Sequence, residues 1–122
     1  MNDHPFAKYV LLLDMNCNLY DMGHPFSMLV RDTMAKFSLV SSFDLMPNFD
    51  PNVCYTRSEP RTNSFTLIDG ILLSDSLTSA ITGVRISDSG NNVSDHRPVE
   101  VYLEVKLTEI SLLKQRAKPT VN

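Results

Sequence analysis

The chain has 122 residues, a length that allows one domain with a small hydrophobic core. Hydrophobic residues make up 43% of the chain and charged residues 20%, a composition that excludes wholesale disorder. The net charge of −3 excludes bulk electrostatic capture of nucleic acid, so a basic binding surface would have to be local. Arg57, Arg61 and Arg97 flank the polar sites described below and are its candidates, with solvated loop residues as the alternative.

The sequence pattern in the first third of the chain predicts a strand followed by a helix. The continuous apolar run at residues 9–13 favours a strand covered on both faces. Asp14 and Asn16 follow it with a period of two, so we expect both side chains to point the same way. Apolar residues then recur at helical spacing over residues 25–37, and Pro25 suits the first turn of a helix.

The rest of the chain predicts strands separated by polar turns. We expect, in chain order, a short strand (38–43), a loop (47–51), a strand (53–56), a polar turn (57–64), a strand (65–73), a turn or short helix (74–79), a short strand (84–86) and a loop (88–92). Pro98 opens a last strand, in which Val101, Leu103, Val105 and Leu107 alternate with polar residues, so one face should be buried.

Cys17 and Cys54 lack the spacing of metal ligands. We expect them to be buried apolar side chains rather than a disulfide, which fits use in a reducing compartment.

Asp69 lies inside the apolar run at residues 65–73, where an unpaired carboxylate would cost several kcal/mol in desolvation. A histidine is the expected partner, because an aspartate on one imidazole nitrogen fixes the tautomer and favours the protonated ring. His96 is better placed than the other two histidines, since it stands at a strand entrance beside Asp95. The alternative is a simple turn at Asp69-Gly70.

Asp14, Asn16, Asp95 and His96 supply the groups that phosphodiester cleavage needs. Asp95 would suit Mg²⁺ or Mn²⁺, which take hard oxygen ligands. Asp14 provides an acid or base and Asn16 an amide donor, although an Asp-x-Asn triplet is also a common strand-end turn. Polar sites on several strands that meet at one point predict a metal-dependent phosphodiesterase.

The order of these motifs resembles the endonuclease/exonuclease/phosphatase family, most of all the endonuclease domains of non-LTR retrotransposons. The motifs are Asp14-Met15-Asn16 after an apolar run, Tyr55-Thr56, Ile68-Asp69-Gly70-Ile71-Leu72, and Ser94-Asp95-His96-Arg97-Pro98. The likeness covers about residues 9–107 and only the second half of the family's domain. It implies an α/β (α+β) fold: the C-terminal half of a four-layer α/β sandwich, mainly antiparallel sheet with one or two flanking helices. Residues 1–107 would form this partial domain, and residues 108–122 a polar tail.

The resemblance also implies roles for single residues. Asp14 would activate the water or handle the leaving-group proton, and Asn16 would hold the phosphate. Asp69 would orient His96, which would contact the scissile phosphate as a cation. Asp95 would help to bind the metal. The substrate backbone would be contacted by three further residues: Asn91, Asn92 and Arg97.

The chain departs from the family pattern at the metal site. The family's first half normally supplies a metal-binding asparagine and glutamate, but none of the four glutamates here ends an apolar strand. Leu13 also stands where a glycine is usual, which restricts how the following turn approaches a phosphate. We therefore expect weak Mg²⁺ (or Mn²⁺) binding and weak or no activity of this chain alone. An uncovered sheet face is expected to favour self-association or binding of a missing N-terminal half.

The sequence thus predicts a Mg²⁺-dependent endonuclease domain that nicks DNA, with RNA as a further nucleic-acid candidate. Two alternatives stay open: a phosphatase of the same family acting on a phospholipid or small phosphoester, and a non-catalytic remnant or interaction module. No apolar run is long enough to span a membrane, so no membrane partner is expected. An intracellular location is expected, and a nuclear one for a retroelement endonuclease.

Overall fold

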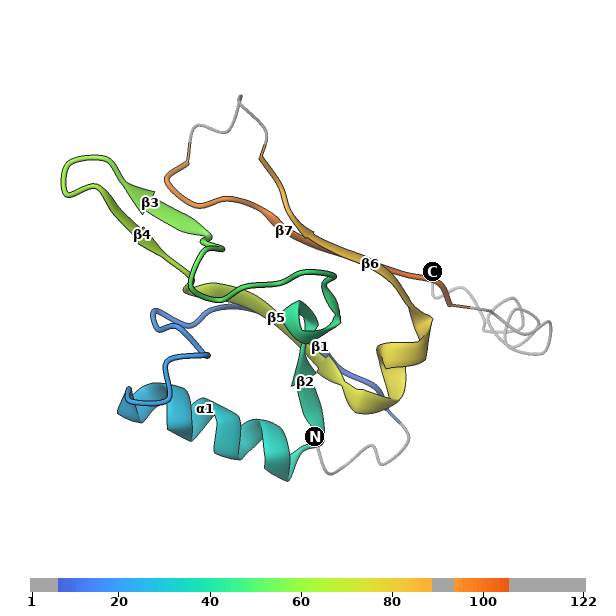
Figure 1. Cartoon of the computed structure of the whole chain (residues 1–122). Coiled ribbons are helices and arrows are strands. Elements are labelled where there is room, and N and C mark those ends of the chain that lie inside the picture. Colours follow the sequence, from blue (N-terminus) through green and yellow to red (C-terminus); the bar gives the residue numbers. More distant parts are fainter. Residues whose placement is uncertain (1–6, 89–93, 106–122) are drawn as a thin grey trace, which may run out of the picture.

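The computed structural model describes residues 7–88 and 94–105 (Figure 1). The elements are, in chain order, β1 (Val10–Asp14), α1 (Pro25–Lys36), β2 (Leu39–Ser41), the 3₁₀ helix η1 (Ser42–Leu45), β3 (Arg57–Glu59), β4 (Ser64–Thr66), β5 (Asp69–Ser74), the 3₁₀ helix η2 (Asp75–Ala80), β6 (Ile81–Ile86) and β7 (Val99–Leu103). The mixed α/β class, with antiparallel sheets and few helices, agrees with the expected fold.

The strands form one sheet and two hairpins within the described residues. β1, β5 and β2 make an antiparallel sheet with β5 in the centre, and the β1–β5 register places Asp14 opposite Asp69. β3 pairs with β4, and β6 with β7. Figure 1 shows the three-stranded sheet between α1 on one side and the β6–β7 hairpin on the other. The central strand β5 is therefore covered on both faces.

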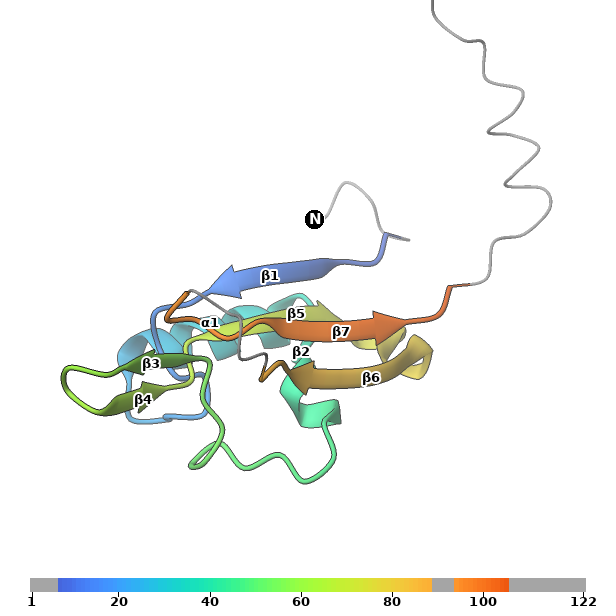
Figure 2. The ribbon, with the colours of Figure 1, turned by 90° about the horizontal axis from the view of Figure 1, so that it is seen from above.

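The expectation that the first strand is covered on both faces is wrong. β1 is an edge strand, and Figure 2 shows it on the far side of β5 from β7. Leu12 is 73% exposed as a result, while Leu73 on β5 is fully buried. An apolar run thus marks both strands but does not indicate which of them the rest of the chain covers; β2, at the other edge of the sheet, is largely buried.

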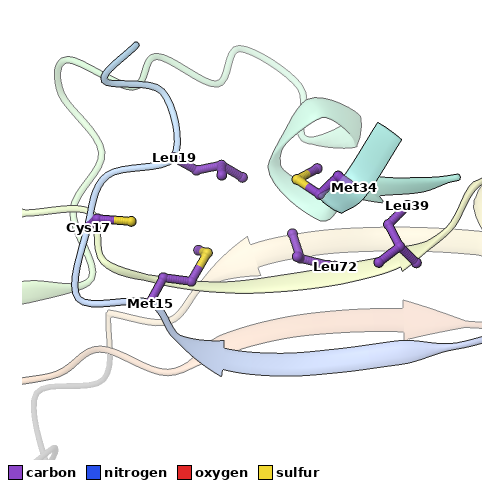
Figure 3. Close-up of a cluster of buried hydrophobic side chains, with 6 residues drawn as sticks. All are labelled: Met15, Cys17, Leu19, Met34, Leu39 and Leu72. Carbon is purple, nitrogen blue, oxygen red and sulfur yellow. The ribbon is translucent and has the colours of Figure 1, made fainter. Parts of the chain in front are cut away.

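The main core lies between α1 and the sheet (Figure 3). Its buried members come from the loop after β1, from α1, from β2 and from β5: Met15, Cys17, Leu19, Met34, Leu39 and Leu72. A second cluster, built on Phe43, Leu67 and Val84, lies beneath the β6–β7 hairpin. Both cysteines are free, with Cys17 buried and Cys54 partly buried, as the sequence predicts.

The helix is confirmed, and its predicted apolar stripe contacts the core in part: Met34, Val30 and Phe37 do so. Ser27 and Met34 are buried, whereas Phe26 and Leu29 are 46% and 58% exposed. The Ser27 hydroxyl donates to the Asn18 carbonyl, which draws this polar residue into the interface. An apolar stripe therefore does not by itself identify the side of the helix that faces the sheet.

Two predicted strands are placed differently. Residues 53–56 form no strand, because the backbone turns at Asp50, whose carbonyl accepts the N–H groups of Val53 and Cys54. Strand β3 instead begins inside the predicted polar turn. The predicted strand at residues 65–73 is divided into β4 and β5 by Leu67 and Ile68.

Other predictions hold in part. The short helix expected at residues 74–79 is η2, and the strand expected at 84–86 is the end of β6. The strand expected at 38–43 ends at Ser41, where η1 begins. β7 is the predicted last strand, but Leu103 and Val105 are 39% and 61% exposed, so the predicted burial of that face fails towards its end. Leu107 and the tail at 108–122 lie outside the described residues, and no helix in the described part has the length and apolar character to cross a bilayer.

Candidate active site

The site is built around a hydrogen bond between His96 and Asp69. His96 Nδ1 lies 2.7 Å from Asp69 Oδ2, and the two side chains are 33% and 18% exposed. Asp69 is the first residue of β5. His96 lies in the segment before β7, where its backbone forms an isolated antiparallel β-bridge with Arg57. Asp69-Gly70 is therefore not a hairpin turn, and this carboxylate has the imidazole partner that its desolvation calls for.

Asp14 completes a cluster of three groups. The β1–β5 register places it opposite Asp69, and ligand atoms of Asp14, Asp69 and His96 all lie within 4.8 Å of one another. The hydrogen bond that His96 donates to Asp69 raises the pKa of His96, burial opposes this, and the charges of Asp69, Asp95 and Asp14 add to the increase. The cluster therefore favours an imidazolium held between carboxylates.

The donor set suits a hard divalent cation with few protein ligands. Mg²⁺ is commonly held by one or two carboxylates and keeps several waters or phosphate oxygens. Because Asp69 is engaged by His96, we expect Asp14 to be the main protein ligand among the described residues. Nothing in the cluster distinguishes Mg²⁺ from Mn²⁺.

Asp95, the metal ligand expected from the sequence, is placed differently. Its Oδ2 accepts a hydrogen bond from Arg57 Nε at 3.1 Å, and its Oδ1 lies 3.9 Å from His96 Nε2. It is not one of the three clustered groups. The ion pair with Arg57 offsets the charge of this carboxylate, so the geometry favours Asp14 over Asp95 as a ligand.

Asn16 lies at the edge of a neighbouring pocket. β1 ends at Asp14, and Asn16 has a φ of 50°, so the period-two argument for a shared direction does not apply. The Asn16 N–H donates to Asp14 Oδ1 at 3.0 Å, which makes the triplet a strand-end turn. The pocket has a volume of about 290 Å³ and is also lined by Tyr55, Cys54 and Phe65.

Arg97 is engaged by the protein itself. Its Nε donates to the Ser87 carbonyl, its Nη1 to the Tyr55 carbonyl, and its guanidinium stacks over the Tyr55 ring at 4.6 Å. Asp88 lies 3.7 Å from its Nη2. These contacts favour a structural role over the predicted contact with substrate. Asn91 and Asn92, the other two residues predicted to touch the substrate, lie outside the described residues.

A second, more open hollow of about 340 Å³ begins at the cluster. Asp69, His96 and Ser94 line one part of it, and Leu12, Leu13 and Val99 line another. A substrate in this hollow would reach the imidazole directly. Thr56 and Arg57 support the cluster through contacts that the sequence did not indicate: Thr56 accepts the Asp69 N–H, and Arg57 pairs with Asp95.

No protein-family model matches the chain, and no curated protein does so either. Among solved structures, it is similar to NExo from Neisseria in two forms. The first is a 3′ phosphatase bound to a product DNA hairpin (TM-score 0.66, 19% identity). The second is a 3′–5′ exonuclease from Neisseria meningitidis (TM-score 0.64, 21% identity). Both likenesses cover 85% of this chain.

This chain shares the NExo fold. That fold is the exonuclease–endonuclease–phosphatase fold, and at this level of identity the likeness shows the fold alone. The chain spans about half the length of these proteins, since the matched part is 48% of each.

Proposed function

We propose that the chain forms part of a metal-dependent phosphodiesterase that nicks DNA. The observation that supports it best is the His96–Asp69 hydrogen bond of 2.7 Å with Asp14 in the same cluster. An imidazolium fixed between carboxylates at the edge of an open hollow suits a reaction at a phosphate, where negative charge grows on oxygen. The similarity to DNA-processing enzymes of the same fold supports the same kind of substrate.

The residues divide the work in a way that their chemistry allows. The protonated His96 ring donates a hydrogen bond to a non-bridging phosphate oxygen and stabilises the charge that develops there. Asp69 holds the ring and its proton in place. Asp14 takes a proton from the attacking water or returns one to the leaving oxygen. Asn16, beside it, would position the phosphate through its amide.

Asp14 and Asp69 would hold the cation, Mg²⁺ or Mn²⁺, that completes the site. When bound, the cation supplies Lewis-acid stabilisation of the phosphate and its leaving oxygen. We expect weak binding, because His96 already engages Asp69. We also propose that the exposed side of β1 binds either a further polypeptide or a second copy of this chain.

Three observations favour DNA over a small phosphoester. One solved relative holds a product DNA hairpin, and the motif order resembles retrotransposon endonucleases. The open hollow also suits a polymer that passes across the surface better than a small molecule that must be enclosed. A nuclear location follows if the chain belongs to a retroelement.

Conversion of supercoiled plasmid to its nicked form in Mg²⁺ or Mn²⁺ tests the proposal, with phosphate release from an inositol phosphate measured alongside. We expect slow nicking and no comparable phosphate release. Asp14→Asn should lower nicking about 10²- to 10⁴-fold, because it removes the proton acceptor and weakens the expected cation ligand, while it keeps an oxygen for the Asn16 N–H.

Asp50→Asn is the matched control for that variant. Asp50 Oδ1 accepts the Asn52 N–H at 2.9 Å, which is the same kind of turn, and Asp50 is not one of the three clustered groups. It should nick at the wild-type rate. Preferential phosphate release would indicate the phosphatase alternative. Absence of both activities, together with absence of saturable Mn²⁺ binding, would indicate a non-catalytic remnant.

A further inference from the structure

Thr56 is a fully buried polar residue next to the site. Its Oγ1 accepts hydrogen bonds from two successive backbone N–H groups, those of Ile68 at 3.1 Å and Asp69 at 3.0 Å. A hydroxyl oxygen has two lone pairs, so one side chain satisfies both donors. These donors lie where the chain passes from β4 to β5. This is the point at which the backbone directs the Asp69 carboxylate towards His96.

The same short segment is also bonded to the His96 side of the site. The Thr56 carbonyl accepts the Arg97 N–H at 2.6 Å, and Ser58 N–H donates to the Asp95 carbonyl at 3.0 Å. Between these two bonds, the backbone of Arg57 forms an isolated β-bridge with that of His96. Residues 56–58 thus hold the start of β5 on one side and the segment before β7 on the other.

We propose that Thr56 is the positioning residue that sets the Asp69 carboxylate against the His96 ring. This inference rests on the proposed function, because it concerns the pair that the function uses. The hydroxyl fixes the peptide planes on both sides of Ile68, and the plane that carries the Asp69 nitrogen sets the direction of the Asp69 side chain. Without the hydroxyl, two buried N–H groups would lack a partner, and this part of the backbone would rotate to find one.

A purely space-filling role is the competing explanation, and the two can be separated chemically. Thr56→Val keeps the shape and burial of the side chain but removes the acceptor. Thr56→Ser keeps the acceptor but removes a methyl group. If packing is what matters, serine should be the more harmful change; if the hydroxyl positions Asp69, valine should be.

The tautomer of His96 reports the positioning without any measurement of cleavage. At a pH where the ring is neutral, a well-placed Asp69 carboxylate favours the Nδ1–H tautomer. Two-bond ¹H–¹⁵N spectra of the histidine-labelled chain give the fraction of each tautomer. We expect mainly Nδ1–H in the wild type and in Thr56→Ser, and mainly Nε2–H in Thr56→Val.

Two further variants calibrate this result. Asp69→Asn removes the carboxylate and shows the spectrum of an unguided ring. Ser27→Ala removes another fully buried hydroxyl, which donates to the Asn18 carbonyl in a different part of the core, and should leave His96 unchanged. Wild-type tautomer fractions in Thr56→Val would overturn the proposal, even if nicking is observed.

A wild-type measurement keeps the proposal testable if Thr56→Val does not fold. The Ile68 and Asp69 amides should exchange slowly with solvent in the wild type and in Thr56→Ser, because the hydroxyl accepts from both. Fast exchange of both amides in the folded wild type would contradict the proposed role. Absence of nicking with the expected tautomers and slow exchange would reject the proposed function but retain the positioning role.

Discussion

His96→Ala is expected to lower the rate of plasmid nicking by about 10²- to 10³-fold. The variant removes the only group of the cluster that can carry a positive charge, and the phosphate loses its hydrogen-bond donor at the point where charge develops. Asp69 would then face the site as an unpaired carboxylate and repel the phosphate. Gel analysis of nicked and supercoiled plasmid over a range of protein concentrations measures the effect.

His24→Asn is the control for that variant. His24 lies at the N-cap of α1, where its Nδ1 accepts the Phe26 N–H at 3.1 Å. Asparagine is also a favoured N-cap residue, so helix stability should be retained. Equal rates for this variant and the wild type are expected. Nicking by His96→Ala at the wild-type rate would mean that the cleavage arises elsewhere on the chain or from a contaminant.

Leu73→Ala should destabilise the chain by about 3 kcal/mol, the typical cost of truncating a fully buried leucine. Leu73 is fully buried in the central strand β5, between α1 and the β6–β7 hairpin, so the lost methyl groups leave a cavity that the sheet cannot close. Urea denaturation followed by circular dichroism gives the free energy of unfolding.

Leu12→Ala makes the same chemical change on the adjacent strand. Leu12 is 73% exposed, so the change in stability should stay within about 0.5 kcal/mol. Equal destabilisation by both variants would contradict the exposure of Leu12. It would show instead that the exposed side of β1 is covered in solution, as self-association would require.

Local sequence signals predicted the helix α1, the last strand β7 and the partner of Asp69. Pro25 and the helical spacing after it located α1, and the cost of burying Asp69 pointed to a histidine partner. The same signals failed where the answer depended on neighbours in space. The apolar run of β1 resembles that of β5, yet the rest of the chain covers β5 and leaves most of β1 exposed.

Hydrogen bonds between distant segments account for the remaining differences. At the split between β4 and β5, the Ile68 and Asp69 N–H groups donate to the hydroxyl of Thr56, 12 and 13 positions earlier in the chain, so the local sequence does not indicate these contacts. Arg57 and Asp95 are likewise far apart in sequence, so no local sequence pattern predicts their ion pair. The carbonyls that engage Arg97 have no sequence signature at all, because every residue has one.

The paired geometry also predicts how stability depends on pH. His96 has a pKa raised above the ordinary histidine value of 6.5 in the folded chain. Its contribution to stability is therefore fully present below 6.5 and is lost as the pH rises through the raised pKa. Asp69→Asn should reduce this dependence, since the hydrogen bond that His96 donates to Asp69 is the largest cause of the raised pKa.

The pKa of His96, measured by NMR titration of its ring in the wild type and in Asp69→Asn, is the most direct test of the cluster as a cationic phosphate site. We expect a value above 6.5 in the wild type and a lower value in the variant. A wild-type value at or below 6.5 that Asp69→Asn leaves unchanged would contradict the account, because the imidazole would then have no carboxylate to hold it.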